Sequence, residues 1–176
     1  MPKCLASKWK LVSEMSAKSI IIAGGGLTGA LAALMLARDG HRVSLYERRG
    51  DIRDAKIVHG RSINLAISTR GLTALERVGL RQEVLDMAVP MRGRRMHGKD
   101  NSTTFQPYSA NEDENIYSIS RGGLNRFLIE QAAAEENVTL FFQHRCMGVD
   151  PRSGVVTFID DESGETKEIN VQIDVC

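Results

Sequence analysis

The stretch that decides the fold is Ser19–Gly29 (SIIIAGGGLTG), together with the forty residues around it. Its β-branched run, Ser19 to Ala23, predicts a buried strand that stops at glycines. Ala30 to Asp39 is rich in Ala and Leu at helical spacing, and Gly40 follows as the expected residue after the helix end. Arg42 to Glu47 (RVSLYE) predicts a second strand. The start of the chain is therefore one β-α-β unit.

Within this unit, residues 24–29 (GGGLTG) match the pattern G-x-G-x-x-G, with an acidic residue, Glu47, 23 positions after the first glycine. The first glycine permits a tight turn, the second lets a pyrophosphate approach the backbone, and the third lets the helix pack against the strand. Glu47 can accept hydrogen bonds from ribose hydroxyls and would repel a 2′-phosphate, so the motif favours FAD or NAD over NADP. The alternative is a glycine-rich turn that binds nothing. The candidate cofactor residues of the motif are Gly24, Gly26, Leu27, Thr28, Gly29 and Glu47.

The rest of the chain alternates short strands and helices. Residues 63–67 are expected to form a strand or a buried extended segment, and residues 138–142 a strand. Further helices are expected at 69–78, 81–88 and 122–136. Two hairpins are expected, one pairing residues 92–96 with 103–108 and one pairing 155–159 with 168–171. The expected fold class is α/β, a Rossmann-like domain with a parallel sheet, a crossover helix and an added β-hairpin.

Composition excludes several classes of protein. The 176 residues correspond to about one domain, with 42% hydrophobic and 26% charged residues, which excludes disordered and fibrous chains. A net charge of +1 gives no argument for nucleic acid or an anionic membrane as partner. The cysteines, Cys4, Cys146 and Cys176, form no metal or disulfide pattern. No apolar run is long enough to cross a membrane, and residues 1–18 indicate a flexible extension.

Several later segments carry a more specific pattern: GRSINLAIS at residues 60–68, PMRGR at 90–94, Pro107 with Tyr108, and SISR at 118–121 followed by Leu124 and Asn125. Together they resemble the kynurenine 3-monooxygenase family, within the single-component FAD-dependent aromatic hydroxylases. The resemblance extends from about Ser19 to the last residue. It implies FAD, rather than NAD, in the β-α-β unit.

The resemblance also implies roles for residues outside the glycine motif. The segment GRSINLA passes under the flavin ring in that family, and the arginine of the SISR run contacts FAD. Cys146 falls where the family has an apolar flavin neighbour, usually leucine. The residues assigned to FAD in this way are Arg48, Arg49, Ala66, Arg121 and Cys146.

Arg94 and Tyr108 match the two residues that hold the carboxylate of the substrate, so residues 90–110 are expected to contribute to the substrate pocket. A guanidinium fork can bind a carboxylate through two hydrogen bonds, and a phenol can add a third. The alternative is that Arg92, Arg94 and Arg95 form a solvated basic cluster and that Tyr108 is a half-buried strand residue. No metal ligand and no catalytic acid or base is assigned.

The implied activity is hydroxylation of L-kynurenine to 3-hydroxykynurenine with NADPH and O₂, a step of tryptophan catabolism and NAD biosynthesis. Two alternatives are a related hydroxylase acting on another aromatic acid and a non-catalytic nucleotide-binding fragment. The resemblance implies a cytoplasmic location for a bacterial protein and the mitochondrial outer membrane for a eukaryotic one. The family has a second flavin-binding stretch beyond the matched region, so the domain at residues 19–176 is expected to be incomplete and inactive alone.

Overall fold

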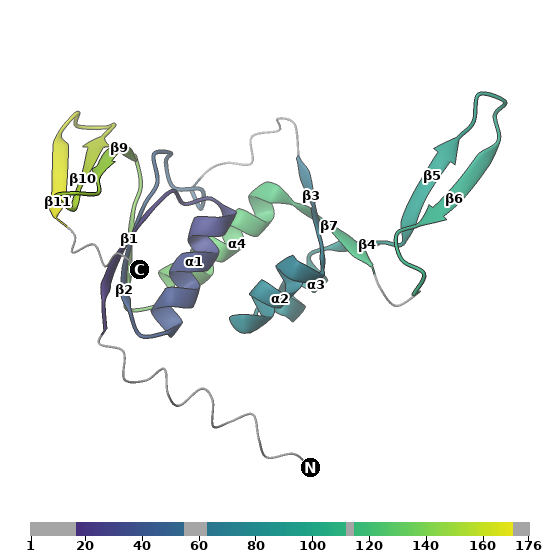
Figure 1. Ribbon diagram of the computed structural model, residues 1–176, viewed down its shortest axis with the longest axis horizontal. Helices are drawn as coiled ribbons and strands as arrows, with labels where there is room; N and C mark the ends of the chain where they lie inside the picture. Colours follow the sequence, from purple (N-terminus) through teal and green to yellow (C-terminus); the bar gives the residue numbers. More distant parts are fainter. Residues whose placement is uncertain (1–16, 55–62, 112–114, 171–176) are drawn as a thin grey trace, which may run out of the picture.

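A parallel three-stranded sheet, in the order β1–β2–β8, lies at the centre of the larger part of the structure (Figure 1). The computed structural model describes residues 17–54, 63–111 and 115–170. The strands are β1 (Ser19–Ala23), β2 (Arg42–Tyr46) and β8 (Val138–Phe141). Because β2 is paired in parallel on both sides, the carboxyl ends of all three strands meet at one edge.

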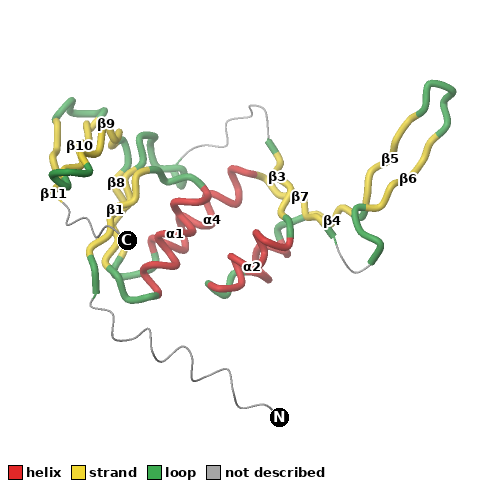
Figure 2. Tube along the Cα trace, in the orientation of Figure 1, coloured by secondary structure: helices red, strands yellow, loops and turns green. Residues whose placement is uncertain are grey.

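Two helices cover one face of this sheet, α1 (Leu27–Arg38) and α4 (Arg121–Ala133) (Figure 2). The core between helices and sheet is fully buried and built around small and aliphatic residues, including Ala30, Ala33, Leu34, Leu45, Leu128 and Ala132. Helix α1 follows β1 and helix α4 precedes β8, so both run antiparallel to the strands. Their N-termini therefore lie at the carboxyl edge of the sheet.

An antiparallel meander covers the opposite face, with the order β11–β10–β9. Its strands are β9 (His144–Asp150), β10 (Val155–Asp160) and β11 (Thr166–Asn170). A second apolar cluster joins meander and sheet: the fully buried Phe158 ring stacks on Tyr46 at 4.0 Å between centroids, and Tyr46 stacks on Phe141 at 4.5 Å. The three layers are thus helices, parallel sheet and meander.

A smaller sheet lies beyond the helices, in the order β3–β7–β4. It contains β3 (Asn64–Ile67), β4 (Val89–Met91) and β7 (Ile116–Ser120), with α2 (Thr69–Arg77) and α3 (Arg81–Asp86) beside it. Beyond β4, the hairpin of β5 (Gly93–His97) and β6 (Thr103–Pro107) projects from the body of the molecule (Figure 1).

The structure confirms the predicted β-α-β unit, the helices and both hairpins, with shifts at their ends. The prediction that Ser19–Ala23 is buried was wrong: β1 is partly exposed, because it lies at the edge of the sheet and pairs only with β2. Helix α1 begins at Leu27, three residues before the expected start, because the amide of Ala30 already donates to the carbonyl of Gly26. Gly40 ends that region with a φ of 89°, as predicted for a residue after a helix. Strands β4, β7 and β9 were missed: β4 has only three residues, and β9 mixes polar and apolar residues without clear alternation.

Some sequence predictions fall outside the described residues. These are the extension up to residue 16, residues 60–62 of GRSINLAIS, and residues 171–176 at the end of the chain. Within residues 17–54, 63–111 and 115–170, no helix combines the length and the apolar character that crossing a membrane requires.

The second apolar cluster gives a direct test of the layered fold. Phe158→Ala is expected to lower the free energy of unfolding by about 3–5 kcal/mol, because it empties a buried aromatic site. Phe105→Ala is the matched control, since Phe105 is 57% exposed on β6, and its effect should stay within about 0.5 kcal/mol. Guanidinium-induced unfolding measures the stability of both variants. Equal losses of unfolding free energy would contradict the placement of Phe158 in a buried second cluster.

Candidate functional site

The glycine loop between β1 and α1 uses its glycines for different purposes. Gly24 has a φ of 114°, a conformation that L side chains rarely adopt, and its amide donates to the carbonyl of Tyr46 at 2.7 Å. A β-carbon on Gly29 would lie 1.9 Å from the carbonyl oxygen of Gly24, so this position must remain glycine for the turn to close. A β-carbon on Gly26 would meet nothing within 4 Å. The space in front of Gly26 is therefore open.

Among the residues that the structure describes, no side chain caps the N-terminus of α1, which faces this open space. Gly26 provides no side-chain cap, and the first turn contains no acidic residue. The first amides of a helix have no acceptor within the helix, and together they carry a partial positive charge. Thr28 is exposed, whereas the Leu27 side chain packs against the main core, so Leu27 can offer a ligand only its backbone. This end of α1 suits a phosphate.

Glu47 lies directly beside the loop, and only 8% of its surface is exposed. One carboxylate oxygen accepts from the amide of Gly25 at 2.7 Å. The other accepts from the amide and the Nε of Arg49, at 3.0 and 3.1 Å. A carboxylate can accept about four hydrogen bonds, so it keeps capacity for a further donor such as a ribose hydroxyl.

Gly25 is a functional residue that sequence reasoning missed. The pattern G-x-G-x-x-G allows any residue there, but a β-carbon on Gly25 would lie 3.0 Å from the β-carbon of Glu47 and 3.1 Å from Cδ2 of Leu45. Any larger residue would therefore push against Glu47. The run of three glycines was the available signal for this requirement.

The surroundings of Glu47 keep it ionised. Burial by itself would raise the pKa of its carboxyl group, but the amides of Arg49 and Gly25 and the charge of the Arg49 guanidinium together outweigh burial. The net effect lowers the pKa of Glu47 below its ordinary value. At neutral pH the site therefore presents a fixed negative charge beside the helix terminus.

Ala66 and Arg121 lie close together in the small sheet, Ala66 on β3 and Arg121 directly after the neighbouring strand β7. Ala66 on β3 pairs with Ser118 on β7, and the amide of Arg121 donates to the carbonyl of Ile63 at 3.1 Å. Arg121 is the first residue of α4, so it lies at the same sheet edge as the glycine loop. Ser120 caps this helix by accepting from the amide of Gly123. The exposed Arg48 follows Glu47 at the same edge.

Cys146 lies on β9, where it pairs with Phe158 and packs against the second apolar cluster. Its role as a neighbour of the flavin stays a prediction. His144, two residues earlier, contacts the carbonyl of Phe142 through Nδ1 at 2.6 Å. In the described part of the chain, no group of three His, Cys, Asp or Glu side chains could hold a metal ion.

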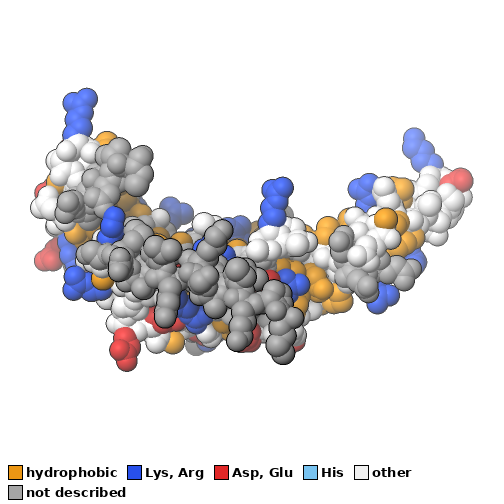
Figure 3. All heavy atoms as spheres, turned by 60° about the horizontal axis from the view of Figure 1, so that its bottom comes forward, with side chains coloured by type: hydrophobic (Ala, Val, Ile, Leu, Met, Phe, Trp, Pro, Cys, Tyr) orange, Lys and Arg blue, Asp and Glu red, His pale blue; other side chains and the backbone are white. Residues whose placement is uncertain are grey.

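Arg94 and Tyr108 share one face of the projecting hairpin. Arg94 pairs with Gln106, and the amide of Tyr108 donates to the carbonyl of Arg92, so the alternation of the strands places Arg94 and Tyr108 on the same side. The Nε of Arg94 donates to Oε1 of Gln106 at 2.8 Å. Both side chains are exposed, and Figure 3 shows Lys and Arg side chains over this end of the molecule. The hairpin stands away from the glycine loop (Figure 1).

Residues 17–173 match the family described as FAD binding domain. The kynurenine 3-monooxygenase of Myxococcus xanthus (strain DK1622) is 45% identical over 157 residues, which cover 89% of this chain and 34% of that protein. The kynurenine 3-monooxygenase of Caenorhabditis elegans is 49% identical over 133 residues, 75% of this chain and 29% of that protein. The chain thus spans about a third of the length of these curated relatives.

Solved structures share the fold at low identity. A mutant of 2-methyl-3-hydroxypyridine-5-carboxylic acid oxygenase superposes with a TM-score of 0.67 at 22% identity, covering 88% of this chain and 38% of that chain. The flavin-dependent monooxygenase PieE, in complex with FAD and substrate, gives a TM-score of 0.66 at 19% identity, covering 88% of this chain and 29% of that chain. At these identities the likeness shows the fold alone.

The contacts of Glu47 predict how stability depends on pH. Glu47→Ala should lower the free energy of unfolding by about 1–3 kcal/mol at pH 7, because it leaves the buried amide of Gly25 without an acceptor. Glu47→Gln retains an acceptor oxygen and should cost less.

The folded pKa of Glu47 lies below the ordinary value of 4.5, so ionisation stabilises the fold above pH 4.5 and this stabilisation is lost as pH falls through the folded pKa. Unfolding measured from pH 7 to pH 3 should therefore show the difference between wild type and Glu47→Gln shrinking. A stability difference between wild type and Glu47→Gln that grows as the pH falls would contradict the lowered pKa of Glu47.

Proposed function

The chain belongs to the FAD binding domain family, which its residues 17–173 match, and from this we propose that it is the FAD-binding part of a monooxygenase that hydroxylates L-kynurenine. The observation that carries the proposal is the bond between the amide of Gly25 and the carboxylate of Glu47, which fixes a carboxylate beside an open helix terminus. The relatives named above support the choice of substrate.

The residues at the sheet edge fit FAD in shape and charge. The open space at Gly26 and the free amides of α1 would hold the pyrophosphate, with Thr28 at its side. Glu47 would accept the hydroxyls of the adenosine ribose. Arg48 and Arg121 would add positive charge near the two phosphates, which balances the negative charge that FAD brings to this edge. Arg49 is paired with Glu47 and would lie beside the ribose.

When bound, FAD supplies the redox chemistry that links NADPH and O₂ to oxygen insertion into an aromatic ring. The protein's own task is to bind and orient. Ala66, with its small side chain on β3, would leave room beside the flavin, and Cys146 is assigned to the same cofactor. Arg94 and Tyr108 would hold the substrate carboxylate, which fixes which carbon of the ring is presented for reaction. The amino group of kynurenine already activates its ring, so no catalytic base is required.

Gly26 provides the test of the cofactor site. Gly26→Ala should weaken FAD binding by about 10-fold or more, because its methyl group would occupy the space in which the backbone approaches the pyrophosphate. Its free energy of unfolding should change little, since nothing lies within 4 Å of that position. Gly148→Ala, which also has open space around it, is the matched control on β9. Quenching of flavin fluorescence measures FAD affinity, and unchanged FAD binding by Gly26→Ala would count against the site.

The hairpin provides the test of the substrate. Arg94→Lys and Tyr108→Phe should each weaken L-kynurenine binding by about 10- to 100-fold, because each removes a hydrogen bond to a charged carboxylate. Arg95→Lys is the matched control, since Arg95 lies on the opposite face of β5. L-Kynurenine titration of the FAD-loaded protein measures these affinities. Equal losses of L-kynurenine affinity in all three variants would favour a general effect on the structure of the hairpin, and no loss would favour a different substrate.

A further inference from the structure

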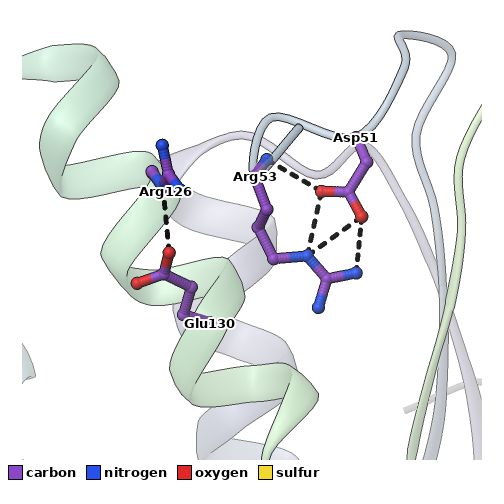
Figure 4. A network of polar contacts seen from close by, with 4 residues as sticks. All are labelled: Asp51, Arg53, Arg126 and Glu130. Carbon is purple, nitrogen blue, oxygen red and sulfur yellow. Dashed lines mark hydrogen bonds and ion pairs between the residues drawn. The ribbon is translucent and has the colours of Figure 1, made fainter. Parts of the chain in front are cut away.

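The loop that carries Glu47 and Arg49 is held at a second place, by Asp51 and Arg53. The Nε of Arg53 donates to both carboxylate oxygens of Asp51 at 2.9 Å, and a terminal nitrogen of Arg53 donates to Oδ2. The backbone amide of Arg53 also donates to Oδ1 at 2.9 Å. One carboxylate thus fixes both the backbone and the side chain of a residue two positions away, which closes the turn at residues 51–54. Figure 4 shows this arrangement.

This ion pair is more sheltered than a typical surface pair. The Asp51 side chain is 16% exposed and the Arg53 side chain 35% exposed. Ile52, between them, packs against the main core. Isolated surface pairs contribute little, but several hydrogen bonds between one guanidinium and one carboxylate hold a defined geometry.

The pair is connected to the cofactor site through the end of β8. The Arg53 guanidinium lies over the ring of Phe142, 5.6 Å from its centroid. Phe141 and His144, one residue before and two residues after Phe142, both bond to the backbone of Glu47: the carbonyl of Phe141 accepts from the amide of Glu47, and the amide of His144 donates to the carbonyl of Glu47. The same short segment therefore contacts both the ribose acceptor and the ion pair.

Helix α4 adds a charged flank to this arrangement. Arg126 and Glu130 form an ion pair at 2.9 Å on the surface of α4 next to the loop (Figure 4). The hydrogen bond from the Arg53 side chain, together with the positive charges of Arg53 and Arg126, outweighs burial and lowers the pKa of Asp51. The hydrogen bond to Asp51, together with the negative charge of Glu130, raises the pKa of Arg53. Both members of the pair are therefore charged at neutral pH. The pair lies where the Glu47 loop meets the helix that begins with Arg121.

We propose that Asp51 and Arg53 are positioning residues for FAD, which hold the loop after β2 so that Glu47 and Arg49 face the adenosine ribose. Neither residue is assigned a contact with the cofactor, and both act through Glu47 and the Phe142 segment. The inference rests on the proposed FAD site and adds two residues that the glycine motif and the resemblance did not include.

The test measures FAD affinity and unfolding separately in the full chain. Asp51→Ala and Arg53→Ala should each raise the Kd for FAD about 10-fold, because the loop loses the contacts that orient Glu47. Arg53→Lys keeps the positive charge but loses the paired hydrogen bonds of the guanidinium. Its loss of FAD affinity should therefore be smaller than that of Arg53→Ala. Glu135→Ala is the matched control: it removes an ion pair with Arg38 at the far end of α1 and should leave FAD affinity unchanged.

A double-mutant cycle separates positioning from a general structural effect. If the pair acts through Glu47, the double variant Glu47→Gln/Arg53→Ala should bind FAD with about the same Kd as whichever of the two single variants has the higher Kd. Losses that multiply, or unchanged FAD affinity in Asp51→Ala and Arg53→Ala, would overturn the proposal. If the wild-type protein binds no FAD even when the second flavin-binding stretch of the family is present, the cofactor site is overturned as well, and the wild-type titration alone distinguishes this outcome.

Discussion

The hydrogen bond from the amide of Gly25 to the carboxylate of Glu47 is the constraint on which the site depends. It joins the loop after β1 to the end of β2, two segments 22 residues apart, in a place where little water can replace it. A buried amide without an acceptor is costly, and a buried carboxylate without donors is costlier still. Each partner therefore requires the other. This bond holds the ends of β1 and β2 together, and with them the glycine turn and the start of α1.

The parallel sheet explains why distant segments reach one edge. Strands β1, β2 and β8 end on the same side, and the helices that follow β1 and precede β8 start there. The glycine loop, Glu47 and Arg121 therefore arrive together although they are separated along the chain. A crevice outside the carboxyl ends of parallel strands is the common place for a nucleotide in such folds. The meander on the other face contributes stability through Tyr46, Phe141 and Phe158.

Local patterns in the sequence were sufficient to predict the β-α-β unit and the backbone roles of Gly24 and Gly29, because the contacts involved lie within one supersecondary unit. The ribose contact of Glu47 stays a prediction. The small sheet was not predictable in the same way. Its order, β3–β7–β4, depends on pairing between segments far apart in the chain, which no local periodicity encodes. Gly25 and the Asp51–Arg53 pair were missed because their importance comes from a neighbour in space. The resemblance singled out Arg94 and Tyr108, whose substrate role stays a prediction, and the pairing of the hairpin adds that they share one face.

The glycine loop also separates two requirements that the motif combines. Gly24, Gly25 and Gly29 are needed by the fold itself, since a side chain at each would strain the backbone or collide with Glu47 or the loop carbonyl. Gly26 meets no such obstacle, so the fold alone gives no reason for glycine there. A larger residue would be tolerated at Gly26 unless something must approach its backbone. The absence of a side chain at this one position is thus the strongest sign within the loop itself that a ligand occupies the space in front of α1.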